Sequence, residues 1–193
     1  MNRFVAIDLE TTGLDHSKDE IIEIALVLFA EGKPTKKLTY ILHTEQPLRP
    51  FISKLTGITQ EEITRAPRFT EVIKEISALI KDQWLVAYNS DFDRQFLEKA
   101  FQKEEKTVPT NQWLDALLAA RIAWPRLENH KLDTVTSFLE LKRETAHRAL
   151  PDALAAGEVF LHALRAIQSR PTSSLEALAL LSKGTAWEQF YPQ

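Results

Sequence analysis

The chain has 193 residues, 44% of them hydrophobic and 26% charged, which is the balance of a globular protein and excludes an intrinsically disordered one. It contains no cysteine, so a disulfide framework and a cysteine-based zinc site are both excluded. The net charge of −3 neither favours nor excludes a polyanionic partner, because bound metal ions would neutralise the carboxylates of an acidic site. This length predicts one domain, or one domain with a short appendage.

Membrane insertion is not expected. The longest apolar stretch, Ile24 to Ala30, is far too short to span a bilayer. Asp8 and Glu10 interrupt the only early apolar run, and no signal peptide is visible. We therefore expect a soluble, cytoplasmic protein without a membrane partner.

The first part of the chain predicts three β-strands, over residues 4–9, 21–29 and 36–42. Asp8 is the only break in the first apolar run, and such runs are typical of a central strand that is covered on both faces. Turn-forming residues from Glu31 to Pro34 join the second and third strands. The simplest arrangement is an antiparallel meander.

Helices dominate the remainder. The apolar residues of 70–81 recur on one helical face, and Pro125 stops a later helix. The elements expected in order are a helix over 70–81, a strand over 85–88, and helices over 90–102, 114–123, 132–139 and 151–167. A meander followed by alternating helices and strands indicates an α/β or α+β domain with three layers.

The C-terminal segment reads as an appendage. Residues 170–174 resemble a linker, so we expect one domain over 1–169 and a helical tail over 170–193. Within that tail a short helix is expected over 175–181. The aromatic residues Trp187, Phe190 and Tyr191 would either pack back on the domain or dock a partner.

The first candidate site residues are Asp8 and Glu10. Residues i and i+2 of a strand share a face, so the two carboxylates would converge at the end of a buried strand. Burial of ionised carboxylates is costly, and a divalent cation would remove that cost. The alternative is a loop that begins early and leaves both acids solvated.

A third acid comes from the segment Asn89 to Asp93. In a helix over 90–102, Asp93 falls near the centre of the apolar stripe, whereas Asp91 falls on the opposite side. A carboxylate on the core face calls for an explanation, while an acid in an exposed first turn is ordinary. We therefore interpret Asp93 as the functional acid and Asp91 as peripheral, with Asn89 as a helix cap.

The last candidates are His147 and Asp152. Pro151 is expected to open the final long helix, which would leave His147 in the preceding loop and place Asp152 at the edge of the buried helix face. An imidazole is the usual general base near neutral pH. Taken alone, a loop histidine is more often simply solvated.

Together these features resemble the DnaQ-like DEDDh 3′→5′ exonuclease superfamily, from about Phe4 to Leu164. Within that superfamily the chain looks closest to proofreading domains of bacterial replicative polymerases and to exonuclease domains fused to DinG-type helicases. The segments that carry the resemblance are FVAIDLETTGL (4–14), IIEIALV (21–27), LTGIT (55–59), LVAYNSDFDRQFL (85–97), LDALLAAR (114–121) and HRALPDALAAGEVFL (147–161).

The resemblance implies a fold and a set of roles. The fold would be ribonuclease H-like, with three layers and a mixed central sheet flanked by helices. Two Mg²⁺ or Mn²⁺ ions would be held by four acids, and His147 would be the general base. Thr11, Thr12 and Leu14 would contact the terminal nucleotide. The four acids would be Asp8, Glu10, Asp93 and Asp152. One departure is Tyr88, where many members have histidine, and we expect it to change only local packing.

The implied activity is hydrolysis of phosphodiester bonds at single-stranded 3′ ends, of DNA rather than RNA. The C-terminal tail would lead to a polymerase or helicase partner or fused domain. The main alternative is a non-catalytic nucleic-acid-binding or polymerase- or helicase-associated module of the same fold. An endonuclease of related fold, or a structural domain with solvated acids, would also be compatible with parts of this pattern.

Overall fold

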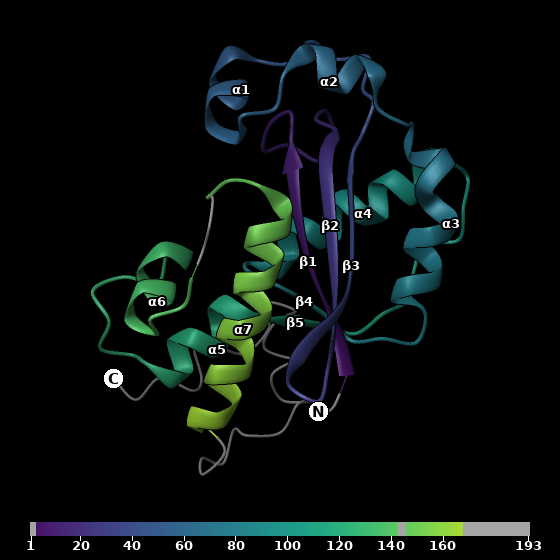
Figure 1. The fold of residues 1–193 in the computed structure, drawn as a ribbon. Coiled ribbons are helices and arrows are strands. Elements are labelled where there is room, and N and C mark those ends of the chain that lie inside the picture. Colours follow the sequence, from purple (N-terminus) through teal and green to yellow (C-terminus); the bar gives the residue numbers. More distant parts are fainter. Residues whose placement is uncertain (1–2, 143–145, 168–193) are drawn as a thin grey trace.

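The computed structural model describes residues 3–142 and 146–167, and the expected tail and the domain boundary at 169 and 170 lie outside these ranges (Figure 1). A single five-stranded sheet has the order β3-β2-β1-β4-β5, antiparallel between the first three strands and parallel between β1, β4 and β5. The strands are β1 (Arg3–Thr11), β2 (Ile21–Ala30), β3 (Lys33–Ile41), β4 (Leu85–Ala87) and β5 (Trp113–Asp115). The predicted antiparallel meander and mixed sheet are confirmed.

Helices cover both faces of this sheet, which gives three layers (Figure 1). They are α1 (Pro50–Thr56), α2 (Gln60–Arg65), α3 (Phe69–Ile80), α4 (Ser90–Lys103), α5 (Ala116–Ala123), α6 (Leu132–Phe138) and α7 (Ala149–Ile167). Within the described residues, no helix is both long enough and apolar enough to cross a bilayer.

The side chains of β1 alternate between the two layers. Val5, Ile7 and Leu9 belong to the core cluster that includes residues of α3 and α4. Phe4 and Ala6 belong to the other cluster, formed with α5 and α7. Because side chains two residues apart share a face, Asp8 and Glu10 continue the row that faces α7.

Some expectations about the elements were wrong or incomplete. The helix predicted over 114–123 begins only at Ala116, because Trp113–Asp115 forms the parallel edge strand β5 beside β4. The short helices α1 and α2 were not predicted. The turn between β2 and β3 is shorter than expected: it uses only Glu31 and Gly32, both with positive φ, which suits the twist of a two-residue hairpin.

The edge strand β3 carries a proline and several lysines. Pro34 lies opposite Phe29, next to a shift in register of the β2–β3 ladder. Proline lacks an N–H and is tolerated at a sheet edge. Lys33, Lys36 and Lys37 are exposed along the same strand.

Helix α7 approaches the sheet closely around Gly157, where alanines and this glycine form part of its buried face. Ala153, Ala156 and Ala163 are fully buried, and Gly157 lies against the ring of Phe29. A Cβ added at Gly157 would lie 2.3 Å from Cε2 of Phe29. That ring has no room to move, since it is fully buried and stacks on Phe4 with a centroid separation of 4.9 Å.

We predict that Gly157→Ala destabilises the fold although alanine favours helix formation. Overpacking a filled core typically costs about 1–3 kcal/mol, more than the gain in helix propensity of about 1 kcal/mol. The free energy of unfolding from urea titration measures the difference. The control is Glu158→Ala on the outer part of the same helix, where we expect a change below about 0.5 kcal/mol. An unchanged or increased stability of Gly157→Ala would show that α7 can move away from Phe29.

Candidate active site

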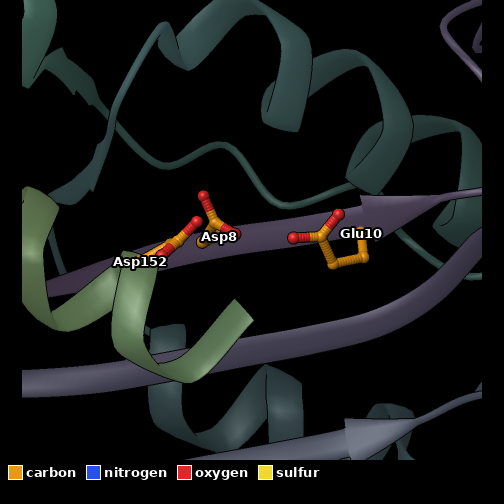
Figure 2. A group of neighbouring side chains, drawn as sticks. All are labelled: Asp8, Glu10 and Asp152. Carbon is orange, nitrogen blue, oxygen red and sulfur yellow. The ribbon is translucent and has the colours of Figure 1, made fainter. Parts of the chain in front are cut away.

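Three carboxylates from two distant parts of the chain meet at one end of the sheet. Asp8 and Glu10 come from β1 and Asp152 from the first turn of α7, and one oxygen from each lies within 4.8 Å of the others. Figure 2 shows Asp8 and Glu10 extending from the strand and Asp152 extending toward them from the helix. Asp152 is only 6% exposed and the two strand acids are half-buried.

The chemistry of this group suits a hard divalent cation. Among the described residues, Asp8, Glu10 and Asp152 form the one group of three acidic or histidine side chains close enough to hold a metal ion. The group offers only carboxylate oxygens as ligands. Such oxygens are the preferred protein ligands of Mg²⁺ and Mn²⁺. Like charges at this separation repel each other, so a bound cation would stabilise all three at once.

Asp93 lies beside this group without being one of its three members. It is 3% exposed, which confirms that it faces the core. Burial raises the pKa of its carboxyl well above the usual range, and repulsion from Asp115 and Glu10 adds to the increase. Hydrogen bonds from the backbone of Asp93 and of Leu9 act in the opposite direction, which places the carboxylate against the strand between Asp8 and Glu10.

The neighbouring Asp91 has a different environment. It is half-buried, and Oδ1 accepts a hydrogen bond of 2.8 Å from Nη2 of Arg94, one turn along α4. The expected cap residue Asn89 makes no side-chain cap and has a left-handed backbone, with φ of 73°. The helical periodicity therefore predicted correctly that Asp93 is buried and that Asp91 is more exposed. The role of Asp93 as a functional acid stays a prediction.

His147 occupies the bend before α7, as expected, although the helix begins two residues earlier than Pro151. Its side chain is exposed, and its backbone is left-handed with φ of 60°. The His147 N–H donates a hydrogen bond of 3.2 Å to Oδ2 of Asp152. The structure thus brings the histidine backbone to the acidic group.

Thr11 and Thr12 use their hydroxyls inside the loop that follows β1. Thr11 Oγ1 donates to the carbonyl of Gly13 at 2.5 Å, and the Thr12 hydroxyl accepts the N–H of Glu20 at 3.0 Å and bonds to Asp19 and Gln46. Both side chains are buried, whereas Leu14 is 86% exposed. Of these three residues, only Leu14 presents its side chain to the surroundings.

Sequence reasoning did not single out Glu23, Arg148 or Asp115. Glu23 lies on β2 directly opposite Glu10, and its buried carboxylate forms an ion pair with the half-buried Arg148. A carboxylate inside the apolar segment 21–30 is the same signal that drew attention to Asp8, and it could have identified Glu23 as well.

Asp115 joins two helix N-termini. Its carboxylate accepts the N–H groups of Leu117 and Leu118 at the start of α5 and those of Asn89 and Ser90 at the start of α4. Burial raises its pKa, while these hydrogen bonds lower it. It therefore fixes the helix that carries Asp93.

Tyr88, which departs from the pattern of the resemblance, has a local structural contact. Its hydroxyl donates a hydrogen bond of 2.6 Å to the carbonyl of His130. Burial raises the pKa of this hydroxyl, so it stays protonated as a donor.

Comparison with known proteins agrees with this geometry. The model of the exonuclease family RNase_T matches residues 5–160. A protein described as DNA polymerase III PolC-type from Caldanaerobacter subterraneus subsp. tengcongensis is 38% identical over 165 residues, which cover 86% of this chain and 12% of the relative. The 3′-5′ exonuclease DinG of Bacillus subtilis is 33% identical over 182 residues, 94% of this chain and 20% of the relative. The chain thus spans about an eighth to a fifth of the length of these relatives.

Solved structures share the fold. Exonuclease X in complex with 5′ overhanging duplex DNA has a TM-score of 0.72 and 23% identity, covering 94% of this chain and 99% of the other. The nuclease domain of 3′hExo, described as a DEDDh family member bound to rAMP, has a TM-score of 0.73 and 21% identity, covering 85% and 92%. These likenesses confirm the ribonuclease H-like architecture.

We predict that Asp93→Asn stabilises the metal-free protein at neutral pH. The raised pKa means that the folded protein binds a proton here more tightly than the unfolded chain, so this stability is present at low pH and is lost as pH rises through the folded pKa. Asparagine mimics the protonated form. The urea midpoint in EDTA should therefore be higher than in the parent at pH 7, and the difference should shrink toward pH 4.

Asp91→Asn is the matched control, with the same chemical change two positions earlier on α4. It loses the ion pair with Arg94 and should not stabilise the protein. If both variants respond equally, burial of Asp93 is not the cause.

Proposed function

This chain belongs to the RNase_T exonuclease family, and we propose that it is a metal-dependent 3′→5′ exonuclease of the DEDDh type. The observation that carries the proposal is the convergence of Asp8, Glu10 and Asp152 within 4.8 Å, with Asp93 against the same strand. Carboxylates this close together repel one another, and a bound divalent cation would reduce that repulsion.

Asp8, Glu10, Asp93 and Asp152 would hold two Mg²⁺ or Mn²⁺ ions. When bound, such ions supply positive charge that stabilises both the attacking and the leaving oxygen of phosphodiester hydrolysis. The β1–β2 ladder would hold Asp8 and Glu10 in place as ligands, because it pairs them with Ala25 and Glu23. Asp152 is fixed by the packing of α7 on β1 and β2.

His147 would take the proton of the attacking water. The bend before α7 keeps its imidazole exposed while its backbone is bonded to Asp152, so the ring can act near the acids without being buried among them. An imidazole is the usual general base for such a proton transfer. Thr11, Thr12 and Leu14 would form the loop that receives the terminal nucleotide, and Leu14 offers the apolar contact.

The proposed substrate is the single-stranded 3′ end of DNA, in preference to RNA. Support comes from relatives whose names refer to a DNA polymerase and to a 3′-5′ exonuclease, and from a neighbour of this fold in complex with DNA. We further propose that residues 1–169 form the exonuclease domain of a cytoplasmic protein. Residues 170–193 would connect it to a polymerase or helicase partner or fused domain.

We predict that Asp8→Asn lowers the rate of degradation by at least about 10³-fold, since it disturbs metal binding rather than one proton transfer. The measurement compares 3′- and 5′-labelled DNA and RNA oligonucleotides with Mg²⁺, with Mn²⁺ and with EDTA, which should abolish product. Asp82→Asn is the control, because Asp82 is exposed in the turn after α3 and asparagine tolerates its positive φ.

Two results would contradict the proposal. Binding of the oligonucleotides without degradation by the unmodified protein would point to the non-catalytic module. Cleavage of circular single-stranded DNA would point to an endonuclease.

We predict that His147→Asn lowers kcat by roughly 10²–10⁴-fold, the usual contribution of a positioned general base, with little change in KM. Asparagine is a better replacement than alanine because it tolerates the left-handed backbone at this residue, so that the variant tests the imidazole alone. His162→Asn on α7 is the control. A kcat that remains within about twofold of the parent would remove His147 from the mechanism.

A further inference from the structure

Glu23 is a buried carboxylate on an inner strand of the sheet. It lies on β2, is 3% exposed and stands opposite Glu10 in the antiparallel register. Like charges directly across two strands destabilise a sheet, and a buried carboxylate without a partner is costlier still. Its location therefore depends on a compensating positive group.

Arg148 supplies that group from the bend before α7. Nε lies 3.2 and 3.1 Å from the two Glu23 oxygens, and Nη2 donates to Oε1 at 2.9 Å. The same carboxylate also accepts the N–H of Ala149 at 3.0 Å. A guanidinium that donates through two nitrogens fixes direction as well as distance.

The residue held between these contacts is His147. Its N–H is bonded to Asp152 on one side, and the two residues after it are bonded to Glu23 on the other. Its backbone is left-handed, which is uncommon for a residue other than glycine. The bend is thus attached both to the sheet and to the helix.

We propose that Glu23 and Arg148 are positioning residues whose ion pair holds the bend so that the imidazole of His147 is presented to Asp8, Glu10 and Asp152. This inference rests on the proposed exonuclease function. It adds the ion pair that would keep the proposed general base close to the proposed metal-binding acids. Glu23 acts through His147 and touches neither the substrate nor the ions.

The kinetic test uses Glu23→Gln, which removes the charge but keeps the shape. A displaced base of this kind costs about 10–100-fold, so kcat should fall by that factor while KM stays within about twofold. In a His147→Asn background the same change should alter kcat by less than about twofold, because the group that it positions is gone. Arg148→Lys keeps the positive charge but cannot donate through two nitrogens. Its kcat should lie between that of the parent and that of Glu23→Gln.

The control is Glu75→Gln, which removes the charge from the acceptor of the Tyr40 hydroxyl, in the layer on the opposite face of the sheet. It should leave kcat and KM unchanged. Equal losses for Glu23→Gln with and without His147 would show a general structural effect and overturn the proposal. A raised KM with kcat retained would show that Arg148 contacts the substrate, and would overturn it as well.

Amide hydrogen exchange gives a readout that does not need activity. Exchange at residues 147–149 should be faster in Glu23→Gln than in the parent or in Glu75→Gln, because Ala149 loses a charged acceptor and the bend loses its attachment. If the parent proves inactive, the proposed function fails, but this comparison still decides whether Glu23 holds the bend. Unchanged exchange there would overturn the positioning role.

Discussion

Close packing of α7 against β1 and β2 is the contact on which the site depends. Alanines and Gly157 let the helix axis approach the sheet until the Phe29 ring fills the remaining space. At that distance the first turn of α7 carries Asp152 to the acids of β1, which come from more than 140 residues earlier in the chain. A larger side chain at Gly157 would clash with Phe29, and a shift of α7 to relieve that clash would carry Asp152 away from Asp8 and Glu10.

The site also concentrates charge that the fold must balance. Glu10 and Glu23 lie opposite each other on neighbouring strands. Asp93 is buried, and both Asp115 and Glu10 lie close enough to raise its pKa. The compensation comes from specific groups: Arg148 for Glu23, backbone N–H groups for Asp115, and backbone hydrogen bonds for Asp93. If Asp93 binds a cation as proposed, stability and metal affinity would be opposed there, since the charge that would bind the cation is the charge that burial disfavours.

Sequence patterns predicted the elements that have strong periodicity. The apolar runs of β1 and β2 and the helical stripes of α3, α4 and α7 each bury enough surface to show in the sequence, and the phase of α4 distinguished Asp93 from Asp91. The three residues of β5 are too few to show a period and continue directly into α5. Helices α1 and α2 have six or seven residues each and are defined by caps and by contacts with Ile22 rather than by a long apolar face. Glu23 and Arg148 are 125 residues apart, so their pairing depends on the tertiary fold alone.

The exposed edge at β3 limits how the sheet can associate with other chains. A free strand edge invites another strand to pair with it, and Pro34 removes one donor from that edge while the register shift beside it distorts the ladder. Three lysines along the same strand would meet their own copies in an edge-to-edge dimer and repel them. Pro34 and these lysines thereby make the β3 edge a poor template for the addition of another strand.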